Sequence, residues 1–276
     1  MTILPEPDPR SRDFLWRDLP NQDLRCVTAE QIAQFNTMGG FVFGNAVGVA
    51  GLSQLLAEID PVIDAMDESI LTIDGGDRFA YGRDNMVFAC NLVEQLESVR
   101  MLATGPLFRA LVHDLIGPDV RLYWDQAVYK GAGRGAVFPW HQDNGYTFSE
   151  PQAYLTCWLA LEDATPENGC PEILPGLHRM GTLVHDSTPE GLSLRGGDDP
   201  AIAATALALP ARAGDLVVFS SLTPHRTGAN RTDRVRKALI LQFMPDGMQL
   251  IERNGAIKPL KDPVRNPLIL RHGSAP

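Results

Sequence analysis

The sequence predicts an α+β protein in which N-terminal helices are followed by an antiparallel β-sandwich or β-barrel. Before Pro118, apolar residues recur at helical spacing in several segments; after it, apolar residues fall in short runs bounded by turn residues. The 276 residues fit one large domain or two small ones. We expect a single domain over 1–276, with an N-terminal arm at 1–25 and a C-terminal extension at 246–276.

Composition and charge narrow the classes of function. Hydrophobic residues make up 44% of the chain and charged residues 21%, and the formal net charge is −10. Nucleic acids and anionic membrane surfaces need a basic patch, so neither is an expected partner. We expect no signal peptide and no membrane span. The widely spaced cysteines favour free thiols in a reducing cytoplasm; they are Cys26, Cys90, Cys157 and Cys170.

The first half of the chain predicts helices. Thr28 and Gln31 form a capping box, and Gly39 ends the helix that it opens. A short strand follows at 41–43, and a second helix begins near residue 51, with an interruption expected at Pro61. Residues 71–88 carry glycines and charges and resemble a loop. Further helices are expected at 92–102 and 106–116.

The second half predicts strands. They are expected at 120–130, 137–143, 154–161, 172–174, 207–209, 216–219 and 236–243. In the last of these, alternation places Arg236, Ala238, Ile240 and Gln242 on one face. Residues 186–206 are acidic, rich in small residues and without periodicity, which is typical of a lid or a disordered loop.

One stretch suggests a metal site. If residues 137–143 are extended, His141 and Asp143 face the same way and Gln142 faces the opposite way. A second histidine, His225, follows the strand at 216–219. Two histidines and one carboxylate with open positions are the ligand set of non-haem Fe(II) oxygenases. A His-x-Asp pair alone is a weak signal, and His178 and His185 are alternative ligands.

Four motifs together resemble the phytanoyl-CoA dioxygenase family over most of the chain, from Phe35 to about residue 245. They are Trp140-His141-Gln142-Asp143, Glu167-Asn168-Gly169-Cys170, Leu174-Pro175-Gly176-Leu177-His178, and His225 to Arg231 continuing to Arg236. The resemblance implies a double-stranded β-helix, a jelly-roll or cupin-like core with the N-terminal helices packed on one sheet. The family usually has Ser where this chain has Leu177, which puts a polar substrate contact there in doubt.

The resemblance also implies roles for particular residues. His141, Asp143 and His225 match the iron ligands, and Arg236 matches the arginine that binds the far carboxylate of 2-oxoglutarate. A one-residue error in register would exchange Arg236 for a neighbour such as Arg234 or Lys237.

Two further residues are assigned to the co-substrate. Thr227 matches a family hydroxyl beside the carboxylate, although a turn hydroxyl is an alternative reading. Among Gln126, Tyr129 and Lys130, we expect Gln126 to orient 2-oxoglutarate. Trp140 and Tyr146 are equally compatible with a substrate pocket and with the core.

The implied activity is hydroxylation of a small molecule with Fe(II), 2-oxoglutarate and O2, releasing succinate and CO2. An intact Asp143 favours a halide-free oxidation, because related halogenating enzymes have a small residue there. Two alternatives stay open: a cupin-like isomerase or lyase with Zn(II) or Mn(II) at the same site, and a catalytically silent binding protein. The substrate is not readable from the expected specificity loops at 71–88, 144–152 and 186–206.

Overall fold

The computed structural model describes residues 4–65, 78–81, 86–133, 137–189, 191–252 and 254–276. Its larger sheet is antiparallel and has eight strands within these ranges. In spatial order they are β1 (Gly40–Phe43), β12 (Leu216–Ser220), β7 (Leu155–Ala160), β14 (Arg236–Pro245), β4 (Val120–Lys130), β3 (Met86–Cys90) and β2 (Arg78–Tyr81), with β17 (Leu268–Leu270) also paired to β4.

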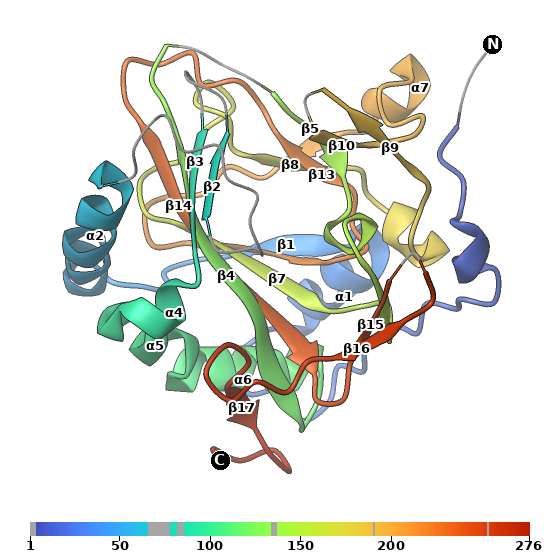
Figure 1. The fold of residues 1–276 in the computed structure, drawn as a ribbon, viewed down its shortest axis with the longest axis horizontal. Coiled ribbons are helices and arrows are strands. Elements are labelled where there is room, and N and C mark those ends of the chain that lie inside the picture. Colours follow the sequence, from blue (N-terminus) through green and yellow to red (C-terminus); the bar gives the residue numbers. More distant parts are fainter. Residues whose placement is uncertain (1–3, 66–77, 82–85, 134–136, 190, 253) are drawn as a thin grey trace.

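A smaller sheet faces the first across an apolar layer. Its order is β11 (Leu207–Ala208), β8 (Pro171–Ile173), β13 (His225–Thr227) and β5 (Phe138–His141). Trp158, Phe219 and Ala238 of the larger sheet pack in one buried cluster with Ile173 of the smaller sheet. The result is a jelly-roll-like core, so the predicted fold class is confirmed (Figure 1).

Helices cover the other face of the larger sheet (Figure 1). They are α1 (Ala29–Met38), α2 (Val49–Asp64), α4 (Leu92–Gln95), α5 (Glu97–Ala103) and α6 (Pro106–Leu115). Leu239, Leu241 and Phe243 of β14 are buried in this helix-side core, and the ring of Phe108 stacks on Phe243 with centroids 5.4 Å apart. The alternate residues of β14 therefore face the space between the sheets, as predicted.

The first helix begins and ends at the predicted residues. The Thr28 hydroxyl accepts a hydrogen bond from the Gln31 backbone N–H, and the Gln31 side-chain oxygen accepts one from the Thr28 backbone N–H, which completes the capping box. Gly39 ends α1 in the left-handed region, with φ of 89°. The chain then enters β1 beside β12.

Two helix predictions need correction. α2 starts at Val49 and continues through Pro61 to Asp64, so the expected interruption is wrong. The apolar stripe of Leu52, Leu55 and Ile59 is buried, and its packing outweighs the lost backbone hydrogen bond. The single helix expected at 92–102 is instead α4 and α5, which are separated by the extended residue Leu96.

Two loop predictions also need correction. Within 71–88, residues 78–81 and 86–88 belong to β2 and β3, and the remainder lies outside the described residues. Residues 186–206 contain most of the hairpin of β9 (His185–Thr188) and β10 (Gly191–Leu194), followed by α7 (Pro200–Ala203). The hairpin is only partly buried, and its residues are mostly small or polar. The alternation of apolar and polar residues that would indicate a strand is therefore weak.

Both terminal segments are bound to the core. In the arm, which includes η1 (Pro9–Ser11), the Asp8 backbone donates to the Thr182 carbonyl and Val184 donates to the Glu6 carbonyl. The C-terminal extension supplies β15 (Gln249–Ile251), β16 (Ile257–Pro259) and β17, and β15 pairs with β6 (Phe148–Glu150). No helix in the described part of the chain is long and apolar enough to cross a bilayer.

Candidate metal and co-substrate site

Neighbouring strands of the smaller sheet bring three metal-ligating side chains together. β13 and β5 are antiparallel, and His225 lies directly opposite His141. Asp143 follows β5 by two residues, at the start of the 3-10 turn η2 (Asp143–Gly145). Its Oδ1 lies 3.9 Å from Nε2 of His141 and 3.6 Å from Nε2 of His225. One ligand atom from each residue lies within 4.8 Å of those of the other two, so the three could hold one metal ion.

The alternation around Gln142 orients these groups. His141 and Asp143 point to the shared site, while the Gln142 side chain bonds in the opposite direction. Its amide donates to the carbonyls of Gly181, at 3.0 Å, and Leu222, and accepts from the Leu183 backbone. Gln142 thus ties the backbone between His141 and Asp143 to two other segments of the chain.

Both imidazoles are held in the neutral state. Nδ1 of His141 lies 2.9 Å from the Pro139 carbonyl, and Nδ1 of His225 lies 3.0 Å from the Thr223 carbonyl. A carbonyl accepts only from N–H, so each Nε2 is left as a lone-pair donor toward the site. Burial lowers the pKa of His141 to about 3 and that of His225 to about 4. Both rings are therefore uncharged near pH 7.

Asp143 receives support from the larger sheet. Burial raises its pKa, and the His141 ring and the side chains of Thr156 and Gln242 oppose that shift. The Thr156 hydroxyl donates to Oδ2 of Asp143 at 2.5 Å. Sequence reasoning missed Thr156, because its proximity depends on how the two sheets face each other; the only available signal was its place in an apolar strand.

Arg236 supplies a buried cation between the sheets. Its side chain is 1% exposed, and none of its three guanidinium nitrogens has a hydrogen-bond partner among the described residues. The guanidinium lies 5.2 Å from the ring centroid of Trp158, and burial lowers its pKa to about 10. The register neighbours point elsewhere: Lys237 bonds Asp60, and Arg234 is exposed.

Lys130 lies directly opposite Arg236 on β4 and is a second buried basic residue. Its ammonium donates to the Thr227 hydroxyl at 3.0 Å and to the carbonyls of Thr227 and Gly228. Burial, together with the charge of Arg236, lowers the pKa of Lys130 to about 7. Thr227 therefore belongs to the same cluster as Arg236, through Lys130.

The other two candidates on β4 have different surroundings. Gln126 lies on the same face as Lys130, and its carbonyl oxygen accepts from the Trp124 indole at 3.1 Å. Tyr129 faces the helices instead, and its hydroxyl donates to Asp60. Tyr129 is thereby separated from the site by the sheet itself.

The alternative ligands lie outside the cluster of three. Nε2 of His178 is 3.2 Å from the Asn36 carbonyl, and its ring packs edge-on against Trp16. Nε2 of His185 accepts from the Gln142 backbone, and its Nδ1 is 2.9 Å from the Leu183 carbonyl. Both rings are therefore engaged in structural contacts.

The two aromatic residues considered for a substrate pocket, Trp140 and Tyr146, have different surroundings. Trp140 is fully buried in an apolar cluster, with Arg226 4.4 Å from its ring centroid, so it belongs to the core. Tyr146 is 53% exposed and lies edge-on to His141, with ring centroids 5.7 Å apart. Tyr146 is thus placed between the metal-ligating cluster and the outside.

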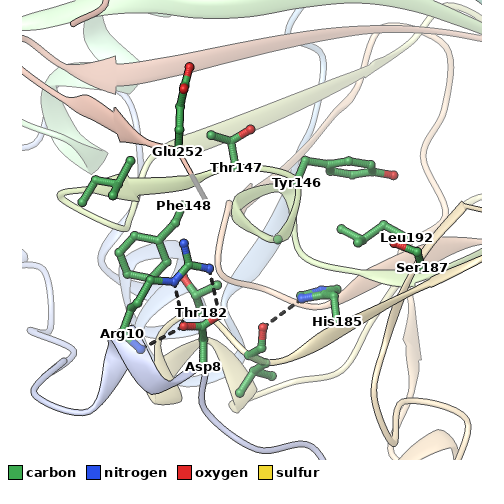
Figure 2. Close-up of a pocket in the computed structure, with 13 residues that line it drawn as sticks. Asp8, Arg10, Tyr146, Thr147, Phe148, Thr182, His185, Ser187, Leu192 and Glu252 are labelled. Atoms are coloured by element: carbon green, nitrogen blue, oxygen red, sulfur yellow. Dashed lines mark hydrogen bonds and ion pairs between the residues drawn. The ribbon is translucent and has the colours of Figure 1, made fainter. Parts of the chain in front are cut away.

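A cavity of about 400 Å³ is lined in part by Tyr146. Its wall includes Asp8, Arg10, Tyr146, Phe148, His185 and Glu252 (Figure 2). Arg10 makes a two-pronged ion pair with Asp8 and stacks its guanidinium 4.3 Å from the Phe148 ring centroid. The N-terminal arm, the β9–β10 hairpin and the chain after β15 therefore all contribute to this cavity.

The residues present fit a ferrous ion and a dicarboxylate. Two neutral imidazoles and one carboxylate with open positions are the donor set of non-haem iron sites. A buried guanidinium without hydrogen bonds is costly unless an anion joins it, and a carboxylate matches its planar fork. A bound dicarboxylate would offer Arg236 the hydrogen-bond acceptors that it lacks among the described residues.

Comparison with known proteins agrees with this geometry. The phytanoyl-CoA dioxygenase (PhyH) family model matches residues 36–238. Methylphosphonate hydroxylase of Gimesia maris is 34% identical over 148 residues, which cover 52% of this chain and 53% of the hydroxylase. The chain therefore spans about half the length of this relative. Phytanoyl-CoA dioxygenase domain-containing protein 1 of Bos taurus is 34% identical over 266 residues, covering 80% of this chain and 91% of that protein.

The fold is shared with solved structures. The epimerase SnoN, crystallised with Fe3+, alpha ketoglutarate and nogalamycin RO, superposes with a TM-score of 0.69 at 23% identity, covering 87% of this chain and 97% of SnoN. That similarity supports the jelly-roll architecture. The family model includes strands of both sheets as far as the start of β14, and it includes His141, Asp143 and His225. The chain belongs to the phytanoyl-CoA dioxygenase family.

Proposed function

We propose that this protein is an Fe(II)- and 2-oxoglutarate-dependent oxygenase that hydroxylates a small molecule and releases succinate and CO2. The observation that carries the proposal is the His141–Asp143–His225 cluster, together with the buried guanidinium of Arg236, which has no hydrogen-bond partner among the described residues. Membership of the phytanoyl-CoA dioxygenase family supports it. We further propose that residues 1–276 act as one domain in the cytoplasm.

Each residue has a defined task in this proposal. His141, Asp143 and His225 would hold iron, and Arg236 would bind the far carboxylate of 2-oxoglutarate beside Thr227 and Lys130. Gln126 would lie farther along the same face of β4. Iron and 2-oxoglutarate, when bound with O2, supply oxidation of an unactivated C–H bond. The chain supplies orientation, neutral imidazoles and a cavity shielded from water.

The type of oxidation depends on Asp143. A carboxylate at this ligand position leaves no room for a halide, which favours hydroxylation or another halide-free oxidation. The alternative functions, a metal-dependent isomerase or lyase and a silent binding protein, gain no support from the family match. Oxygen consumption that depends on 2-oxoglutarate would separate the oxygenase from both.

The first test removes the carboxylate ligand. Loss of a residue that only supports a metal ligand typically lowers activity by roughly 10–100-fold. Asp143→Ala removes a proposed ligand itself, so it should reduce substrate-linked succinate production by more than this. Asp198→Ala, which removes an exposed carboxylate, is the control and should match the wild type. Undiminished succinate from the Asp143 variant would contradict the metal assignment.

The second test addresses the co-substrate. Arg236→Ala should raise the 2-oxoglutarate concentration needed for half-maximal rate by at least about 10-fold, since a charge-assisted pair is lost. Iron content should stay near that of the wild type. Arg234→Ala is the matched control, because Arg234 is exposed. If the two variants exchanged their effects, the anchor would be Arg234.

The substrate proposal rests on the cavity next to Tyr146. Its volume of about 400 Å³ and its charged and hydroxyl-bearing walls suit a small polar molecule better than a long acyl thioester. The name of the Gimesia maris relative, a methylphosphonate hydroxylase, also indicates a small substrate. Metabolites should be screened for substrate-stimulated succinate. Tyr146→Ala should then raise KM for the hit without changing the 2-oxoglutarate requirement, and an unchanged KM would exclude this cavity.

A further inference from the structure

We propose that Thr156 and Gln242 are positioning residues that restrict Asp143 to one metal-binding oxygen. This inference rests on the proposed function, because it concerns how the carboxylate would meet iron. Neither residue belongs to the cluster of three that could hold the metal. Both lie on the larger sheet, whereas the two histidines lie on the smaller one.

The two oxygens of Asp143 have different partners. Oδ1 faces the histidines, at 3.6 Å from Nε2 of His225 and 3.9 Å from Nε2 of His141. Oδ2 accepts the Thr156 hydroxyl at 2.5 Å. The carboxylate is thus divided between a metal-facing oxygen and a protein-bound oxygen.

Gln242 fixes the direction of the Thr156 hydroxyl. Its side-chain amide donates to Thr156 Oγ1 at 3.2 Å, so the hydroxyl proton is left for Asp143. Thr156 and Gln242 are opposite each other on β7 and β14 and are 1% and 7% exposed. A buried chain of donors on paired strands holds its geometry better than one on a loop.

Restricting the carboxylate preserves coordination positions. Three protein ligands that each give one atom leave about three positions of an octahedral ion, which 2-oxoglutarate and O2 together require. Bidentate coordination by both oxygens of Asp143 would occupy one of these positions. The hydrogen bond from Thr156 disfavours bidentate coordination, because Oδ2 would have to give up a charge-assisted hydrogen bond.

The test compares Thr156→Val with Thr156→Ser by anaerobic titration. Fe(II) affinity is measured first, and the metal-to-ligand charge-transfer absorption is then followed as 2-oxoglutarate is added. Val keeps the shape and removes the hydroxyl, so Asp143 loses its fixed orientation and Fe(II) binding should weaken by about 10–100-fold. Because Oδ2 is then free to bind the metal as well, the 2-oxoglutarate midpoint should rise. Ser restores the hydroxyl and should restore both quantities. Tyr129→Phe removes a hydroxyl on the opposite face of the same sheet and should change neither.

Gln242→Leu provides a second, independent variant. It removes the donor that orients the Thr156 hydroxyl and should change both quantities in the same direction. Wild-type Fe(II) affinity and 2-oxoglutarate midpoint in either Thr156→Val or Gln242→Leu would overturn the inference. Failure of the proposed function differs from this result, because the wild-type protein itself would then show no charge-transfer absorption.

Discussion

At the residue scale, the site is defined by charged groups placed where water cannot reach them. Arg236 and Lys130 lie opposite each other on paired strands, and both are at most 1% exposed. Burial lowers the pKa values of both, to about 10 and about 7. Such a pair is expensive to bury, and a bound dianion would offset that cost. These buried basic side chains therefore fit the binding of an anionic co-substrate.

Buried neutral histidines predict a pH dependence of stability. Burial lowers the pKa of His178 to about 4, against an ordinary value of 6.5. Between these values the unfolded chain binds a proton that the folded protein does not. The free energy of unfolding therefore falls as pH drops from 6.5 toward 4, by up to about 1.4 kcal/mol per pH unit for each such group.

His178→Gln isolates this contribution away from the metal-ligating cluster. Chemical denaturation at several pH values gives the slope of the free energy of unfolding against pH. In the variant, that slope should correspond to about one proton fewer between pH 4 and 6.5. Asp125, whose pKa burial raises to about 6, acts with the opposite sign but is present in both proteins. An unchanged slope would mean that His178 is already protonated in the folded state.

At the element scale, the junction of α1 and β1 depends on a glycine. Gly39 has φ of 89°, and an added Cβ would lie within contact of the Thr223 hydroxyl and 2.7 Å from Nδ1 of His178. Gly39→Ala should therefore lower the free energy of unfolding by on the order of 2–4 kcal/mol. Gly44→Ala is the control, since its Cβ would meet nothing closer than 3.8 Å. Equal stability of the two variants in urea would contradict this account.

Elements were predictable where the local pattern and the burial agreed. The α1 capping box and the alternation of β14 both follow from local rules, and the structure contains both. Pro61 was misjudged because tertiary packing of α2 overrode a local penalty. The β9–β10 hairpin was missed because its residues alternate too weakly in polarity to reveal a strand.

At the scale of the whole molecule, segments far apart in sequence complete the site. The sequence predicts the two histidines, Asp143 and Arg236 as candidates because each stands in a recognisable motif. It gives no indication of Thr156 as a partner of Asp143, since that contact depends on the packing of two sheets. The contribution of Asp8 and Arg10 to the cavity is equally unreadable, because it depends on where the arm docks.

Removing the N-terminal arm tests whether the arm contributes to the cavity and not to the proposed metal site. A chain lacking residues 1–12 loses the backbone bonds to Thr182 and Val184 and the Ser11–Gln152 contact. We expect a lower melting temperature and a higher KM for the substrate, because one wall of the cavity is gone. Fe(II) and 2-oxoglutarate binding should persist, since none of their proposed ligands lies in the arm. Loss of both would show that the arm supports the metal site itself.

The central claim is that three side chains and one guanidinium form a single iron and 2-oxoglutarate site. Its most direct test is anaerobic addition of Fe(II) and then 2-oxoglutarate to the wild-type protein, followed by absorption spectroscopy. We predict a charge-transfer band that saturates at one equivalent of each, is lost in His225→Ala, and needs more 2-oxoglutarate in Arg236→Ala. A wild-type protein without the band, or a band unaffected by both substitutions, would contradict the claim.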